Sequence, residues 1–166
     1  MPKKTLLAIA LTFAILALIP LSASALQKGD AFPELKGKTI EGTDFDLTAF
    51  KGESILLKIG TTWCGACRMQ NKAISSISNY LKENKVHVVD VFLQESEKTV
   101  RKYFTNEGYE LPETIVLDEG DIHKSLNVYL VPRVILIDKS YKVYRDGAEI
   151  SSKNLKKRLE AMLTND

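Results

Sequence analysis

Residues Ser54 to Cys67 read SILLKIGTTWCGAC, and this stretch decides the fold. The apolar run from Ser54 to Gly60 predicts a buried strand, and apolar residues at helical spacing after it predict a helix from about Cys64 to Glu83. Cys64 and Cys67, the only cysteines of the chain, therefore lie where a strand passes into a helix. A Cys-x-x-Cys pair in this place is typical of a reversible redox site.

A purely structural disulfide is the alternative interpretation of the pair. Closing a loop of only four residues restricts the unfolded chain by about 2 kcal/mol, and strain reduces that gain. Stabilisation alone is therefore a weak reason for the spacing, and redox chemistry is the favoured interpretation.

The first 25 residues have the layout of a secretory signal peptide. Lys3 and Lys4 precede an apolar run from Leu6 to Leu21, and Ala23-Ser24-Ala25 follows with small residues where a signal peptidase cuts. The apolar run is short for a bilayer span of about 20 residues, although an uncleaved anchor is the alternative. We expect cleavage after Ala25, export to the periplasm or another extracytoplasmic space, and a single domain over residues 26–166.

Charge excludes one class of function. Of the 23 basic and 21 acidic residues, Lys3 and Lys4 belong to the leader, so residues 26–166 carry no net charge. No long basic run is present, and we expect no nucleic-acid partner.

The rest of the chain alternates between strand-like and helix-like segments. A β-hairpin is expected around Gly37-Lys38. The further strands expected are Ser54–Gly60, Val86–Leu93, Glu113–Leu117, Val134–Ile137 and Lys142–Arg145. Helices are expected at 64–83, after Ser96, within Ile122–Val128 and after Ser151. This alternation predicts an α/β domain with a central sheet and helices on both faces.

Four segments carry a resemblance to a known family: Leu47–Gly52, Thr62–Arg68, Glu95–Asp121 and Tyr129–Asp138. Together they resemble exported thioredoxin-fold proteins of the TlpA/ResA-like branch. The resemblance implies a thioredoxin-like fold with a central mixed sheet flanked by helices. It also implies an N-terminal hairpin and an inserted helix and strand in the middle of the domain, at Glu95–Asp121.

The two cysteines have different expected roles. Only a thiolate attacks a disulfide, and unpaired N–H groups at a helix N-terminus favour negative charge. Cys64 is therefore the expected nucleophile, and Cys67, one turn inside the helix, is expected to resolve the mixed disulfide. The resemblance implies the same assignment. Gly65 and Ala66 set the tightness of the turn and so tune the reduction potential.

Three residues are expected to bind substrate. The resemblance implies that Trp63 forms a wall of the substrate groove, with core packing as the alternative or additional role. It also implies a cis bond between Val131 and Pro132, which lets the backbone of Val131 pair with an incoming peptide. The alternative is an ordinary proline at the first position of a strand.

Three further residues replace groups that commonly tune this kind of site. Lys58 stands where cytosolic thioredoxins carry a buried acid. Its ammonium either favours a thiolate on the nearby sulfurs or reaches the surface along its own stem. Gln70 stands where some relatives carry an active-site Glu. Lys72 replaces a helix-kinking proline, which predicts a straighter first helix.

The expected function is disulfide reduction in partner proteins, such as apocytochrome c, by a monomeric extracytoplasmic thiol–disulfide oxidoreductase. No cofactor is expected beyond the redox-active disulfide Cys64–Cys67, and a membrane-embedded thiol reductant would supply electrons. One alternative is an oxidant that introduces disulfides. Another is a thiol peroxidase, since Thr61 precedes Cys64 by three residues, but Leu57 stands where those enzymes have proline.

A copper-delivery module is the remaining alternative, with the two thiolates and one histidine as ligands. His87 and His123 have no companion histidine, and no metal site is expected. The aromatic residues Tyr80, Tyr103, Phe104 and Tyr129 are expected to pack in the core.

Overall fold

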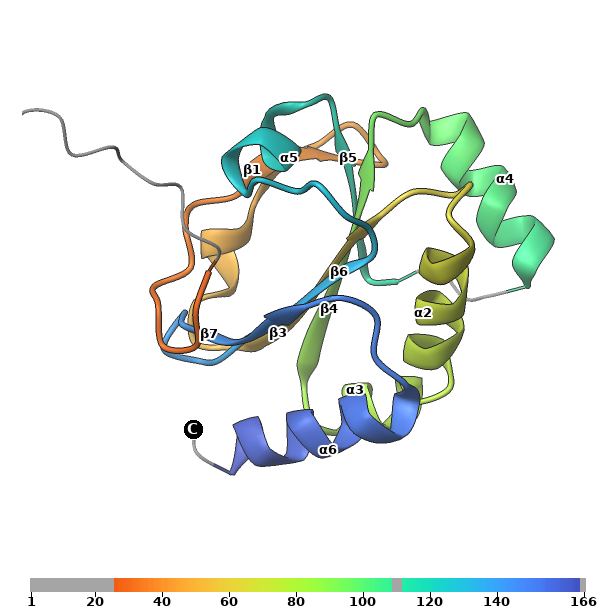
Figure 1. The fold of residues 1–166 in the computed structure, drawn as a ribbon. Coiled ribbons are helices and arrows are strands. Elements are labelled where there is room, and N and C mark those ends of the chain that lie inside the picture. The colour runs from red at the N-terminus through yellow and green to blue at the C-terminus, as the bar shows by residue number, and fades with distance from the viewer. Residues whose placement is uncertain (1–25, 109–111, 165–166) are drawn as a thin grey trace, which may run out of the picture.

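Seven strands form one mixed sheet in the computed structural model, which describes residues 26–108 and 112–164 (Figure 1). The elements are β1 (Lys36–Thr39), β2 (Asp44–Asp46), the 3₁₀ helix η1 (Leu47–Phe50), β3 (Ser54–Gly60), α2 (Gly65–Ser75), α3 (Ser78–Glu83), β4 (Val86–Leu93), α4 (Glu97–Glu107), β5 (Thr114–Asp118), α5 (Asp121–Ser125), β6 (Arg133–Ile137), β7 (Val143–Gly147) and α6 (Ser152–Leu163).

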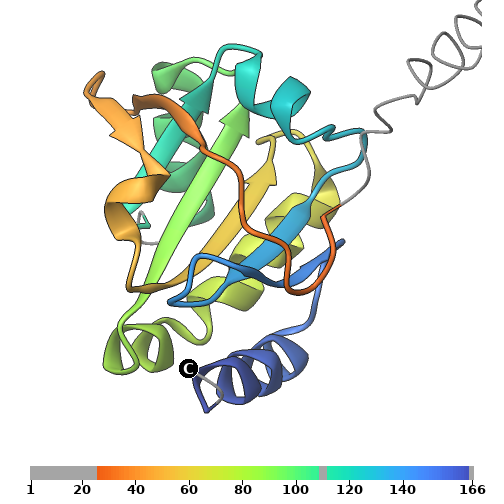
Figure 2. The same ribbon diagram turned by 90° about the vertical axis from the view of Figure 1, so that its left-hand side faces the viewer.

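The strands lie in the order β2-β1-β5-β4-β3-β6-β7, with the twist visible in Figure 2. β3, β4 and β5 pair in parallel, whereas β6 and β1 pair antiparallel to their neighbours β3 and β5. β3 lies in the interior of the sheet and is buried at all seven positions, which is why its sequence is a nearly continuous apolar run rather than an alternating one.

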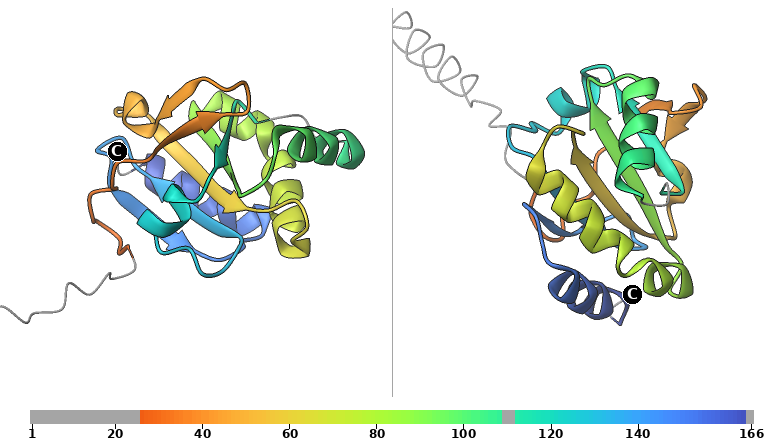
Figure 3. Two further views of the ribbon diagram at one scale, coloured as in Figure 1. Left: turned by 90° about the horizontal axis from the view of Figure 1, so that it is seen from above. Right: turned by 90° about the vertical axis from the view of Figure 1, so that its right-hand side faces the viewer.

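Alternate residues of β3 belong to different faces of the sheet. Ile55, Leu57 and Ile59 join the core cluster that also contains residues of the N-terminal segment, η1 and α5. Leu56 joins the cluster formed with α3 and α6, and α4 packs farther along the same face (Figure 3). Because strand side chains alternate, Lys58 points to the same face as Leu56.

The predicted position of the N-terminal hairpin turn is wrong. Gly37 and Lys38 lie inside β1, and the turn spans Ile40 to Thr43 instead. Gly42 adopts φ +81°, a conformation that few residues other than glycine take, and Thr39 N donates to Thr43 O across the turn (2.9 Å). Gly37 lies close to Val116 Cγ1 in β5, where a side chain would be crowded.

The single helix expected from Cys64 to Glu83 is also wrong. α2 continues past Lys72 but ends at Ser75, and α3 begins at Ser78. The Ser76 hydroxyl donates to the Ala73 carbonyl (2.8 Å), a local bond that competes with helix continuation. This bond lies at the break between the two helices.

The thioredoxin-like α/β fold is confirmed, including the inserted pair α4 and β5. The predicted signal peptide lies in residues 1–25, outside the described residues. In residues 26–108 and 112–164, no helix combines the length and apolar character needed to cross a bilayer.

Candidate active site

Cys64 caps the N-terminus of α2. β3 ends at Gly60, three residues lead to Cys64, and the helix begins at Gly65. The Cys64 sulfur accepts a hydrogen bond from Cys67 N at 3.1 Å, one of the N–H groups that a helix start leaves without a backbone partner. A negative charge on this sulfur is therefore stabilised by a backbone donor and by the helix dipole.

Cys64 and Cys67 form a disulfide and differ in accessibility. Cys64 is half-buried, whereas Cys67 is 1% exposed. A partner protein can therefore reach only the first sulfur without a rearrangement of the helix. Gly65 is exposed and Ala66 half-buried in the first turn of α2, between the two cysteines.

The segment before β6 lies against the dithiol. The Val131–Pro132 peptide bond is cis, as predicted, and the Val131 carbonyl oxygen lies 3.8 Å from Cys64 Sγ. Trp63 is 75% exposed beside Cys64, so a role in core packing is wrong. The expectation that Tyr129 packs is also wrong, because 87% of its surface is exposed.

Lys58 is completely buried beneath α2, so the interpretation that it reaches the surface is wrong. Gly60 makes room for it beside the dithiol. A Cβ placed on Gly60 would lie 2.9 Å from Cys67 Sγ and 3.2 Å from Lys58 Nζ. The sulfur and the ammonium therefore both lie against this one glycine, and they cannot be farther apart than the sum of the two distances.

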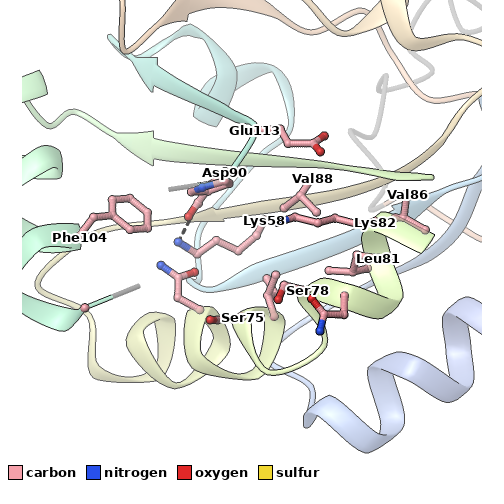
Figure 4. Close-up of a pocket in the computed structure, with 15 residues that line it drawn as sticks. Lys58, Ser75, Ser78, Leu81, Lys82, Val86, Val88, Asp90, Phe104 and Glu113 are labelled. Atoms are coloured by element: carbon pink, nitrogen blue, oxygen red, sulfur yellow. Dashed lines mark hydrogen bonds and ion pairs between the residues drawn. The ribbon is translucent and has the colours of Figure 1, made fainter. Parts of the chain in front are cut away.

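Asp90 of β4 is the partner of Lys58, and sequence reasoning missed it. The two residues are opposite each other in the parallel pairing of β3 and β4, and Lys58 Nζ donates to Asp90 Oδ1 at 2.8 Å (Figure 4). Lys58 Nζ also lies 4.5 Å from the centre of the Phe92 ring. A lone acid within the apolar run of Val86–Leu93 was the signal that could have revealed this pair.

Burial raises the pKa of the Asp90 carboxyl, and the ammonium of Lys58 and a hydrogen bond from Asn71 oppose that shift. Asn71 lies on α2 and also donates to Tyr103 Oη at 3.2 Å. The pair borders a cavity of about 400 Å³ between α2, α3 and β4 (Figure 4). The site thus contains a buried, hydrogen-bonded ion pair on the inner side of the dithiol.

Glu95 is a second residue that sequence reasoning missed. Its carboxylate accepts hydrogen bonds from Thr62 N at 2.8 Å and from Thr62 Oγ1 at 2.5 Å. These bonds attach the loop that contains Trp63 and Cys64 to Glu95, at the start of the inserted segment. The resemblance had indicated the insertion, but nothing in the local sequence indicates a contact across 33 residues.

Gln70 is buried, and the hydrogen bond of its side chain is a structural one. Its Oε1 accepts a hydrogen bond from Ile150 N at 2.7 Å, which ties α2 to the segment before α6. The side chain therefore holds the helix that carries the dithiol.

The histidines have partners of their own. His87 stacks on Phe50 and lies 3.0 Å from Thr114 Oγ1, while His123 Nδ1 lies 3.5 Å from Asp118. Within residues 26–108 and 112–164, no group of three or more His, Cys, Asp or Glu side chains could hold a metal ion. This arrangement gives the copper-delivery interpretation no support.

Comparisons with known proteins agree with the geometry. The Redoxin family model matches residues 27–163. A thiol-disulfide oxidoreductase ResA of Bacillus thuringiensis is 27% identical over 83% of this chain and 78% of its own length. The ResA protein of Geobacillus thermodenitrificans is 27% identical over 95% and 90%. A putative thiol:disulfide interchange protein DsbE from Chlorobium tepidum has a TM-score of 0.73 at 24% identity, covering 83% of this chain and 99% of that one.

A thioredoxin-like sheet with Cys64-x-x-Cys67 at the start of α2, facing a cis-proline, defines a thiol–disulfide oxidoreductase of the thioredoxin fold. The chain belongs to the Redoxin family. The predicted class of fold and of activity, dithiol–disulfide exchange, is therefore confirmed.

Proposed function

We propose that this protein reduces disulfides in partner proteins outside the cytoplasm, with Cys64 as nucleophile and Cys67 as resolving cysteine. The observation that carries the proposal is the contrast between the two sulfurs. The half-buried one caps a helix and faces the Val131 carbonyl, and the other is buried beneath it.

The reaction proceeds in two exchanges. The Cys64 thiolate attacks a partner disulfide, which forms a mixed disulfide and releases one partner thiolate that takes up a proton. The Cys67 thiol then loses its proton and attacks Cys64 Sγ, which releases the second partner thiolate and forms the Cys64–Cys67 disulfide. The partner gains two electrons, and this protein loses two.

The surrounding residues support this sequence of steps. Trp63 and the Val131–Pro132 segment border the attacked sulfur and form the substrate groove, in which the backbone of Val131 pairs with an extended peptide. Lys58 favours the thiolate form of the dithiol, while Gly65 and Ala66 set the turn between the sulfurs. Gln70 tunes the site only indirectly, by holding α2 in place.

The leader and the relatives support the proposed location and the proposed exchange chemistry. With a signal peptide in residues 1–25, the domain works in an oxidising compartment, where its disulfide must be re-reduced. A membrane-embedded thiol reductant is the fitting electron donor, and exported proteins with reducible disulfides, such as apocytochrome c, are fitting substrates. The Bacillus and Geobacillus relatives are named thiol-disulfide oxidoreductases.

Trapping with Cys67→Ser tests the assignment. The variant should retain a mixed disulfide through Cys64 and so reveal the partner on a non-reducing gel. Cys64→Ser is the matched control and should trap little. If Cys64→Ser accumulates the mixed disulfides instead, the two roles are reversed.

A further inference from the structure

The outer surface of the last helix, α6, carries a concentration of positive charge. Residues 26–166 have no net charge, yet α6 contains four exposed basic residues and a single acid, Glu160. Two further basic side chains lie beside the helix. We call the six residues together the basic face: Lys28, Arg145, Lys153, Lys156, Lys157 and Arg158.

Contacts place Arg145 and Lys28 beside α6. Arg145 pairs with Leu136 across β6 and β7, and Leu136 belongs to the core cluster that α6 covers. Burial, together with the nearby positive charge of Arg158, lowers the pKa of the Arg145 guanidinium, so these two cations lie close together. The Lys28 ammonium lies 4.2 Å from the centre of the Tyr144 ring, which packs against the same cluster. The basic face therefore extends from α6 onto the edge strand β7.

The cations of the basic face have no carboxylate partners. Elsewhere on the surface, basic side chains are paired with acids, as in Lys36–Glu34, Lys38–Asp44 and Arg101–Glu97. Within residues 26–108 and 112–164, none of the six side chains of the basic face forms an ion pair, and the Lys156 ammonium instead lies 4.8 Å from the centre of the Tyr80 ring. Like charges gathered without counter-charges repel one another, and an anionic surface would relieve that repulsion.

The apolar side of α6 is not available to a partner. Leu155, Leu159 and Met162 are completely buried against the sheet and α3. A helix that keeps its apolar side in its own domain cannot insert that side into a bilayer. Any attraction between α6 and a membrane is therefore electrostatic and is made with the headgroups alone.

The basic face lies away from the dithiol. α6 packs on Leu81 and Val86, and Val86 pairs with Ser54 where β3 begins. Cys64 follows the other end of β3. A surface that covers α6 therefore leaves the reactive sulfur open to partner proteins.

We propose that the basic face docks this domain on membranes that carry anionic lipid headgroups. This surface function goes beyond dithiol–disulfide exchange and does not require it. Lys28 follows the predicted leader by three residues, so a chain held by its leader meets the membrane beside the basic face. Each Lys or Arg near an anionic membrane strengthens binding by about fivefold, and the attraction falls off within a Debye length.

Vesicle co-sedimentation tests the proposal. The domain of residues 26–166 is used, because the seven strands and the three core clusters lie within it. At an ionic strength of about 0.01 M, where the Debye length is about 30 Å, we expect binding to equimolar phosphatidylcholine and phosphatidylglycerol but not to phosphatidylcholine alone. Raising the ionic strength to about 0.1 M should weaken the binding. The variant Lys153→Gln/Lys157→Gln/Arg158→Gln should bind about a hundredfold more weakly, since three charges are lost.

A control of equal charge separates the basic face from net charge. Lys36→Gln/Lys38→Gln/Arg101→Gln also removes three cations, but each of these is paired with an acid, and it should bind the vesicles as the wild type does. Both variants should reduce disulfides at the wild-type rate, which shows that they fold. Equal binding of the wild type to the two kinds of vesicle would overturn the proposal. Wild-type affinity in the α6 variant, or an equal loss of affinity in the control variant, would also overturn it.

Discussion

Removing the Lys58 ammonium should lower the reduction potential of the dithiol. The ammonium lies beside Cys67 Sγ and stabilises a thiolate, which exists only in the reduced form. Lys58→Met keeps an unbranched apolar stem in the same space but removes the charge. The reduced form then loses this stabilisation, and the protein becomes a stronger reductant.

The magnitude follows from the distances. At the upper limit of roughly 6 Å between the sulfur and Nζ, and with an effective dielectric constant of about 20, the ammonium alone would stabilise a thiolate by about 3 kcal/mol. The Asp90 carboxylate, 2.8 Å from Nζ, opposes this and leaves about 1 kcal/mol. For a two-electron couple, loss of the ammonium alone in Lys58→Met should therefore lower the potential by about 60 mV, whereas loss of the whole ion pair should lower it by about 20 mV.

Two further variants separate the charges. Asp90→Asn leaves the ammonium unopposed and should raise the potential by about 40 mV, because about 2 kcal/mol of opposing interaction is lost. The double variant Lys58→Met/Asp90→Asn removes both charges and should lie about 20 mV below the wild type. Equilibration with thiol buffers of known potential measures all of them, read by the fluorescence of Trp63, the only tryptophan.

The decisive result is that the reduction potential changes in opposite directions in Lys58→Met and Asp90→Asn. A fall in potential for Asp90→Asn would refute the electrostatic argument, as would values within about 5 mV of the wild type for all three variants.

Stability provides an independent readout for Lys58→Met, which leaves Asp90 without its counter-charge and should cost about 3–5 kcal/mol at neutral pH. Burial raises the pKa of Asp90, so the folded variant binds this proton more tightly than the unfolded chain. Its free energy of unfolding should therefore increase as the pH falls toward the ordinary carboxyl range.

Two other residues give sharp expectations. Burial lowers the pKa of His87 from 6.5, against the smaller opposing effects of Glu113 and Glu53, so the unfolded chain takes up this proton first as the pH falls. As the pH falls below about 6.5, the urea concentration at the unfolding midpoint should therefore decrease for the wild type and decrease less for His87→Gln. Parallel curves for the two proteins would contradict this. Glu95→Ala should cost about 2 kcal/mol, because Thr62 loses two hydrogen bonds to a charged group, and it should slow exchange at Cys64. Thr62→Val should have a non-additive effect with Glu95→Ala, and full additivity would argue against the contact.

Local pattern was enough to predict the strand, the dithiol and the helix start. The apolar run of β3 and the cysteines at its end are contiguous in sequence, and such signals do not depend on tertiary contacts. The hairpin turn and the end of α2 were harder. Both Gly37 and Gly42 are compatible with a turn in the sequence. In the structure it is Gly42 that adopts the positive φ of the turn. α2 ends beside Ser76, whose hydroxyl donates to the Ala73 carbonyl, and the apolar periodicity gives no sign of this end.

The burial of the Lys58 ammonium could not be predicted from the sequence. Its alternation with Leu56 determines which face of β3 it occupies, but not whether its ammonium reaches water. That depends on Asp90, which is 32 residues away and meets Lys58 only through the register of two parallel strands. The exposure of Tyr129 had no local signal either, since the burial of an aromatic side chain depends on what the rest of the fold places around it.

The two sides of the dithiol separate potential from recognition. On the buried side, Lys58 and Asp90 act on the sulfurs at short range, and because both are shielded from solvent, salt screens them little. On the exposed side, Trp63 and the Val131–Pro132 segment border Cys64. A change of potential can therefore be made at Lys58 or Asp90 without altering the side chains that border the exposed sulfur.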